Sequence, residues 1–251
     1  MGIFILKLIG YAIIAFFMST IIHELGHVVC GLIHGWKFLM MVIGPFKFYR
    51  ETPDDRIRFG IEKNPSLWGG CGGTFPNKVD DRALKVFSRI LLAGPVASFI
   101  LGIVFCVILV VTKNELAMMI GFVALGEGVA CILPMKIKTG ILYNDGTRCM
   151  RIVKGGQTAA EEKAILTFAF DEFLHGTKDT FDKDMVEVLM DSEDAYFRYY
   201  GFYYTYRNAK HDGNEAEMVK MQSEMEALSE KVSNFIRQAC VLEKGRSEGH
   251  G

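Results

Sequence analysis

The sequence predicts a mainly α-helical, polytopic membrane protein with a three-helix transmembrane core, a small membrane-associated β-hairpin region and a C-terminal helical cytoplasmic domain. Three observations lead to this fold class. Half of the 251 residues are hydrophobic and the mean hydropathy is +0.22, which is high for a water-soluble domain. The apolar residues gather in three long runs within residues 1–155. Residues 156–251 are richer in charged and aromatic residues and contain no such run.

The first apolar run is expected to form a membrane span over residues 3–33. Its residues 3–22 contain one charge, Lys7, and as a helix they would extend about 30 Å, the thickness of a hydrocarbon core. The run lacks a basic leading region and a small-residue cleavage site. We therefore interpret it as a retained span rather than a removable signal peptide.

Two further spans are expected at residues 88–111 and 116–135. The second span is uncharged from residue 90 onwards, and the third contains only Glu127. An acidic residue in a span indicates either a functional group or, here between two glycines, a local helix break reached by water, and we assign it no role. Gly94-Pro95 in the second span permits close approach of a neighbouring helix, so we interpret it as a packing feature.

The distribution of charge predicts how the spans are oriented. Residues 1–155 hold 17 Lys and Arg against 10 Asp and Glu, whereas residues 156–251 hold 11 against 19. Basic residues follow the first and third spans, and between the second and third there is essentially Lys113 alone. The positive-inside rule places residues 36–89 and those after 136 in the cytoplasm and the amino terminus outside. We expect an integral protein of a bacterial plasma membrane. Topology and anionic lipid explain the basic residues, and no nucleic-acid module is indicated.

A motif at the end of the first span gives the strongest indication of function. His23-Glu24-Leu25-Gly26-His27 places two histidines four residues apart, so both imidazoles lie on one side of a helix. There they can bind Zn²⁺ while the glutamate accepts a proton from water as a general base. Charged groups in a span cost about 2.5–3.5 kcal/mol each, so they are usually retained for a function. The alternative, polar side chains that only reach from a helix end to the interface, does not require this spacing.

A catalytic zinc ion needs a third protein ligand, and Asp145 is the leading candidate. It lies in Asn144-Asp145-Gly146, beyond the third span, which the topology returns to the side where the histidine motif emerges. On this segment alone, an ordinary Asn-Asp-Gly turn is the better explanation. The six cysteines show no Cys-x-x-Cys spacing, so we expect free thiols and neither a disulfide framework nor a cysteine zinc module.

Four features of residues 1–155 occur in an order typical of one known family. They are the histidine motif, a glycine-punctuated β-hairpin region at about 38–75, a small-residue segment of the second span, and a Pro…Asp-Gly element at and beyond the end of the third. After the histidine motif they read Met41-Val42-Ile43-Gly44-Pro45 with Trp68-Gly69-Gly70-Cys71-Gly72-Gly73, then Ala93-Gly94-Pro95, then Cys131-Ile132-Leu133-Pro134 with Asn144-Asp145-Gly146. In these features the chain resembles the site-2 protease family of intramembrane zinc metalloproteases.

The resemblance implies a zinc endopeptidase in which His23, His27 and Asp145 bind the metal and Glu24 polarises the attacking water. Residues 1–155 would then be a transmembrane protease core that cuts near the cytoplasmic face. Its substrate would be a membrane-spanning peptide or protein, such as a peptide precursor, a signal-peptide remnant or a membrane-tethered regulator.

Two departures from the family pattern stand out in the third element. Cys131 occupies the usual position of an asparagine, so a substrate-handling role of that asparagine is not carried over. Pro134 is farther from Asp145 than in the commonest pattern. In the hairpin region, residues 41–61 could form a strand edge that pairs with an extended substrate. A hairpin that only plugs the cytoplasmic side explains them equally well.

Residues 156–251 are expected to form a separate cytoplasmic domain of short helices. Apolar residues at helical spacing predict helices around 166–174 and 185–189. A helical hairpin follows, whose second helix runs from Glu215 to about Leu242. The aromatic cluster of the hairpin's first helix could bind a partner peptide, but core packing is the favoured interpretation.

The carboxy-terminal tail from Lys244 is predicted to be disordered.

A second function stays open beside proteolysis, namely a non-catalytic membrane scaffold that binds client helices and recruits a cytoplasmic protein through residues 156–251. The intact His23, Glu24 and His27 count against it, since such a scaffold has no physical need for them. A peptide-exporter component is a weaker alternative, because three spans build little of a conduit.

Overall fold

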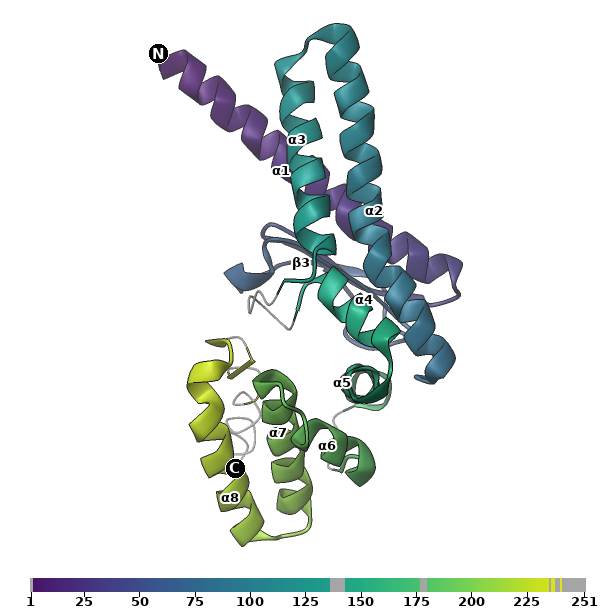
Figure 1. The fold of residues 1–251 in the computed structure, drawn as a ribbon, viewed down its shortest axis with the longest axis vertical. Coiled ribbons are helices and arrows are strands. Elements are labelled where there is room, and N and C mark those ends of the chain that lie inside the picture. Colours follow the sequence, from purple (N-terminus) through teal and green to yellow (C-terminus); the bar gives the residue numbers. More distant parts are fainter. Residues whose placement is uncertain (1, 136–142, 177–179, 235, 238–239, 241–251) are drawn as a thin grey trace. The chain divides into compact units, whose positions relative to one another are not determined.

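The computed structural model describes residues 2–135, 143–176, 180–234, 236–237 and 240 (Figure 1). The chain divides into two compact units. The first contains residues 1–135 and 144–150, and the second contains residues 136–143 and 151–251. Whereas the sequence suggested a boundary at residue 155, this division falls within a helix, α4 (Asp145–Lys154).

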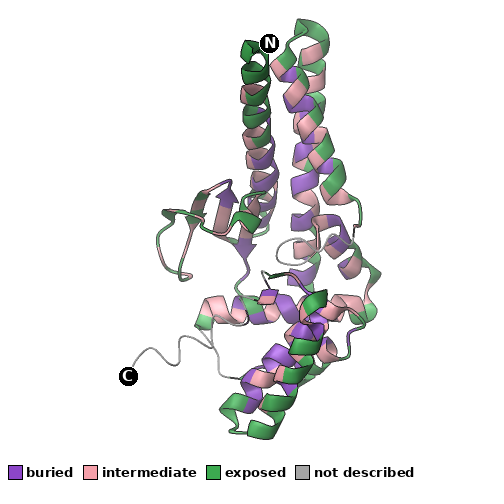
Figure 2. Ribbon diagram, turned by 90° about the vertical axis from the view of Figure 1, so that its left-hand side faces the viewer, coloured by how far each residue is buried: buried purple, intermediate pink, exposed green. Residues whose placement is uncertain are grey.

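Three helices of the first unit are long and apolar enough to cross a membrane. They are α1 (Gly2–Ile33), α2 (Asp81–Thr112) and α3 (Glu115–Ile132), and each packs against the other two. Large apolar side chains such as Ile3, Val111 and Phe122 are exposed. Figure 2 shows exposed stretches in green along these helices. This is the pattern expected where lipid tails replace water around a helix. The prediction of a mainly helical protein with three apolar helices of spanning length is confirmed.

Two helix ends differ from the predicted spans for local reasons. Helix α2 begins at Asp81, well before residue 88, because Asp80 caps it and its carboxylate accepts a backbone N–H at 2.8 Å. Helix α3 ends before residue 135. Leu133 precedes a proline and adopts the extended conformation that this position favours.

The predicted β-hairpin region forms a larger structure, a four-stranded antiparallel sheet. Its strands are β1 (Lys37–Ile43), β2 (Phe46–Tyr49), β3 (Arg58–Ile61) and β4 (Cys71–Phe75), in the order β3-β2-β1-β4. Strands β1 and β2 are joined through Gly44, whose φ of +55° favours glycine. Strand β4 also packs against α1. The glycine-rich sequence of β4 is thereby brought to the helix that carries the histidine motif.

The second unit is helical in its described residues. Its helices are α5 (Gly156–His175), α6 (Lys183–Met190), α7 (Ala195–His211) and α8 (Glu215–Leu228), followed by a short 3₁₀ helix (Ser229–Lys231). Helices α7 and α8 contact each other. Six aromatic residues of α7 are buried in the core of this unit, as the packing interpretation expects: Tyr196, Phe197, Tyr199, Phe202, Tyr203 and Tyr204.

The predicted length of the last helix is wrong. Helix α8 ends at Leu228, and Val232 is extended. The Ser233 hydroxyl then accepts a hydrogen bond from the backbone N–H of Ile236 at 3.4 Å. This is the bond of a helix N-cap, and Asn234, Ile236, Arg237 and Cys240 are helical, so a separate helical segment starts at Ser233 where α8 was predicted to continue. The predicted disordered tail from Lys244 lies outside the described residues.

Candidate metal centre

His23, Glu24 and His27 lie in the second half of α1 and are buried, with 3%, 5% and 6% of their surfaces exposed. The two imidazoles lie on the same side of the helix, edge to face, with 4.9 Å between their ring centroids. Buried polar groups are costly when they lack partners. The surroundings of these three side chains therefore decide what they can do.

Both imidazoles use Nδ1 for a hydrogen bond and leave Nε2 free for another partner. Nδ1 of His27 lies 2.7 Å from the carbonyl oxygen of Ile90 on α2. Since a carbonyl only accepts, this nitrogen carries the proton, and Nε2 of the neutral ring keeps its lone pair. Nδ1 of His23 lies 2.9 Å from the hydroxyl oxygen of Ser98, also on α2. Bonds of this kind fix the ring orientation of metal-binding histidines.

Asp145, the first residue of α4, brings its carboxylate to both rings. Its Oδ2 lies 3.3 Å from Nε2 of His23 and 3.4 Å from Nε2 of His27. Burial raises the pKa of the Asp145 carboxyl, whereas hydrogen bonds from the two imidazoles, when these are protonated at Nε2, hold that pKa below its usual range. The structure thus brings together the three side chains that the sequence predicted as ligands.

The neighbouring Asn144 explains how Asp145 is held there. Its amide nitrogen donates to the carbonyl oxygens of Ala130 and Leu133, at 2.9 and 2.7 Å, near the end of α3. Its amide oxygen accepts from the backbone N–H of Thr147 at 3.1 Å. One side chain therefore satisfies free carbonyls at the end of α3 and a free N–H at the start of α4. The Asn-Asp-Gly tripeptide does more than make a turn.

Two of the three donor-atom spacings, those from Asp145 to each imidazole, fit a zinc ion. Zinc bonds to nitrogen and oxygen of about 2.0–2.2 Å put tetrahedral ligands about 3.3–3.6 Å apart, and both Asp145 distances fall in this range. With Nδ1 protonated, two imidazole lone pairs and an ionised carboxylate face one another. Three acceptors in such an arrangement call for a cation. Two imidazoles and a carboxylate are also a donor set that catalytic zinc accepts.

Gly94 of α2 keeps the space beside the imidazoles open. A Cβ atom at this position would overlap Nε2 of His27 and lie 2.8 Å from Nε2 of His23. Opposite it on α1, a Cβ at Gly26 would lie 2.9 Å from the Cβ of Ala97, so the two helices touch almost backbone to backbone. The sequence indicated close helix packing here, but not that the packing borders the site.

Glu24 faces glycines that precede and begin β4. A Cβ at Gly72 would lie 2.7 Å from Oε2 of Glu24, and one at Gly70 would overlap Oε1. Gly70 also has a φ of +116°, which residues with side chains rarely adopt. The glycine-rich sequence therefore lets the backbone approach this carboxylate directly.

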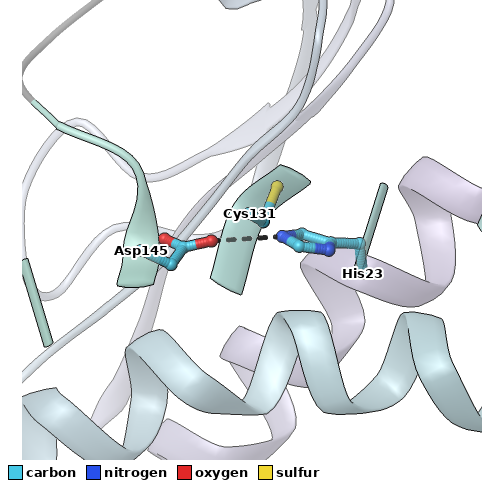
Figure 3. A group of neighbouring side chains, drawn as sticks. All are labelled: His23, Cys131 and Asp145. Atoms are coloured by element: carbon cyan, nitrogen blue, oxygen red, sulfur yellow. Dashed lines mark hydrogen bonds and ion pairs between the residues drawn. The ribbon is translucent and has the colours of Figure 1, made fainter. Parts of the chain in front are cut away.

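Cys131 is a neighbour of the site that sequence reasoning did not assign to it. Figure 3 shows its thiol beside His23 and Asp145. One ligand atom from each of these three residues lies within 4.8 Å of the others, so they too form a group that could hold a metal ion. Its position at the end of α3, which Asn144 joins to α4, brings it here. All six cysteines are free, as expected.

Comparison with known proteins gives one clear result. The model of peptidase family M50 matches residues 11–242, which is nearly the whole chain. The match includes most of the second unit, beyond the residues 1–155 that carry the motifs. Comparison with curated proteins and with solved structures gives no match.

Proposed function

The chain belongs to peptidase family M50, the site-2 protease family of intramembrane metalloproteases, and from this premise we propose that it is a zinc endopeptidase. His23, His27 and Asp145 bind the zinc ion, and Glu24 moves the proton of the attacking water. The observation that carries the proposal is the convergence of both Nε2 atoms on Oδ2 of Asp145, at 3.3 and 3.4 Å.

The proposed reaction is hydrolysis of a peptide bond with Glu24 as general base and acid. Zinc at this position supplies Lewis-acid activation of water and of the scissile carbonyl. The Glu24 carboxylate accepts a proton from the water as the water oxygen attacks the carbonyl carbon. Glu24 then gives that proton to the nitrogen as the C–N bond breaks. A carboxylic acid and an amine are released, the acid passes its proton to the amine or to water, and Glu24 is again free to accept a proton.

The substrate proposed is a membrane-spanning peptide or protein that presents an extended segment. A helix has its amides bonded internally, so the scissile bond must be unwound before water can reach it. Within residues 41–61, β3 is an edge strand of the sheet, but the edge strand beside the histidine motif is β4. Gly72 of β4 borders Glu24. Pairing of the substrate with this edge would hold a peptide bond near the base.

The proposed setting is a bacterial plasma membrane, with the amino terminus outside and the second unit in the cytoplasm. The basic residues after the first and third spans support this orientation. Peptide precursors, signal-peptide remnants and membrane-tethered regulators are the candidate substrates. Residues 156–251 are proposed to be where a cytoplasmic protein binds.

The test compares purified wild type with Glu24→Gln and a matched control, Glu51→Gln. Glu51 is an exposed residue paired with Arg58 at the sheet, so its substitution is the same chemical change outside the site. We expect near-stoichiometric zinc in all three proteins. Cleavage should fall about 10²- to 10⁴-fold in Glu24→Gln alone, since this is the usual contribution of a general base. Comparative peptidomics of membranes carrying wild type or Glu24→Gln would identify the substrates.

Two outcomes would contradict the proposal. Undiminished cleavage by Glu24→Gln would remove this residue from the mechanism. Full biological function of a Glu24→Gln strain that has lost all cleavage would favour the membrane scaffold instead.

A further inference from the structure

Glu127 of α3 is a carboxylate within the third apolar helix that the proposed reaction does not use. Its Oε2 accepts a short hydrogen bond from the hydroxyl of Ser19 on α1 and another, at 3.3 Å, from the hydroxyl of Ser98 on α2. Both serines are almost completely buried, with 1% and 0% of their surfaces exposed. Glu127 therefore joins all three apolar helices through one oxygen atom.

The same Ser98 hydroxyl contacts a proposed metal ligand. Its oxygen lies 2.9 Å from Nδ1 of His23, so the three groups form a continuous chain from Glu127 through Ser98 to His23. A hydroxyl has one proton to donate and can accept further bonds. The Ser98 hydroxyl donates its single proton to Oε2 of Glu127. Ser98 can then only accept from His23, and Nδ1 of His23 must carry the proton.

The two histidines differ in how this proton is fixed. His27 donates to the backbone carbonyl of Ile90, which can never donate, so its tautomer is set by the fold alone. His23 bonds to a hydroxyl, which can either donate or accept. Its tautomer depends on what lies on the far side of Ser98. An acceptor there places the lone pair of His23 on Nε2, which faces Asp145.

We propose that Glu127, acting through Ser98, is a positioning residue that holds His23 as the Nδ1–H tautomer with Nε2 ready to bind the metal. This inference rests on the proposed zinc centre and adds a buried carboxylate behind one of its ligands. Partners of this kind usually change metal affinity or activity by about 10- to 100-fold when they are removed. The Glu127 carboxylate keeps the Ser98 proton directed away from His23, so that the Ser98 oxygen accepts from Nδ1 of His23.

The test measures zinc affinity by competition with a chromophoric chelator, using the full-length protein in detergent. We expect Ser98→Ala and Glu127→Leu, which leaves no acceptor for the Ser98 proton, each to bind zinc about 10- to 100-fold more weakly than wild type. The double variant should lose little more than the stronger single variant, because both act through one chain of bonds. Ser88→Ala is the matched control. Ser88 lies on the same helix, and its hydroxyl donates to the carbonyl of Lys85. The zinc affinity of Ser88→Ala should therefore equal that of wild type.

A second measurement separates positioning from general loss of structure. Nitrogen-15 spectra of histidine-labelled, zinc-free protein distinguish protonated from unprotonated ring nitrogens, and the His23 signals are identified by their absence in His23→Ala. We expect protonated Nδ1 in wild type and a shift of the proton toward Nε2 in Glu127→Leu. The His27 signals should not move. This readout stands even where Ser98→Ala does not fold.

The outcomes distinguish this inference from the function on which it rests. If wild type binds no zinc, or if His23→Ala binds it as tightly as wild type, the zinc centre itself is wrong. If wild type binds zinc and His23→Ala does not, the centre stands. In that case, unchanged affinity and an unchanged His23 tautomer in Glu127→Leu would overturn the role of Glu127 alone.

Discussion

Gly94→Ala adds a single methyl group beside the proposed metal centre. The new Cβ would overlap Nε2 of His27 and lie 2.8 Å from Nε2 of His23. Both rings are anchored through Nδ1 to groups of the helix that carries Gly94. They cannot move aside without lengthening those bonds. The methyl group is therefore expected to push the ring nitrogens away from Asp145.

The size of the effect follows from this crowding. An extra methyl group in a well-packed site costs about 1–3 kcal/mol. When that cost falls on the ligand geometry, zinc affinity drops by about 5- to 150-fold. Pro95 follows Gly94, and a Cβ on the residue before a proline crowds the helical conformation, so the helix gains nothing from the alanine. We therefore expect a loss of metal binding, and thermal unfolding of the zinc-free protein measures how much of the cost falls on the fold.

The assay pairs zinc affinity, measured by chelator competition, with thermal unfolding of the zinc-free protein. Gly126→Ala is the matched control, because Gly126 also lies in an apolar helix and a Cβ there would meet nothing within 4 Å. This control should bind zinc like wild type. Zinc affinity of Gly94→Ala within twofold of wild type would refute the reasoning, since the methyl group would then fit without moving the rings.

Two further predictions concern the neighbours of Asp145. Asn144→Ala removes the bonds to Ala130, Leu133 and Thr147, so we expect about 1 kcal/mol lower stability, the usual cost of a lost cap, together with weaker zinc binding. Loss of stability with unchanged zinc affinity would show that Asn144 does not place the ligand. If zinc is held by nitrogen and oxygen alone, X-ray absorption of the zinc protein should show bonds of about 2.0–2.2 Å. A sulfur atom at about 2.3 Å that disappears in Cys131→Ser would instead make Cys131 a ligand.

The features that depend on neighbouring residues in the chain could be predicted from the sequence. The length of each apolar run gives the three helices, and the spacing of His23 and His27 places both rings on one side of α1. Helix ends were less accurate, because they depend on single side chains. The cap at Asp80 starts α2 early, and the extended backbone of Val232 separates α8 from the helical residues after Ser233.

The features that depend on how helices cross could not be predicted. Gly94 and Ser98 border the imidazoles only because α2 packs tightly against α1. The sequence of α2 alone does not predict which of its residues will face the histidines of α1. Glu127 was recognisable as an acid in an apolar helix, but its link to His23 passes through a residue of another helix. The position of Ser19, one turn before His23, was the available signal for a polar stripe along α1.

The hydrogen bonds of Asn144 give the proposed centre a mechanical property. The two histidines of the centre lie on the first span. Asn144, which precedes Asp145, bonds to carbonyls at the end of the third span. Helices adjust their tilt when the thickness of the surrounding bilayer changes. A change in tilt between these two helices would alter the gap between the imidazoles and the carboxylate, and metal occupancy would then depend on lipid chain length.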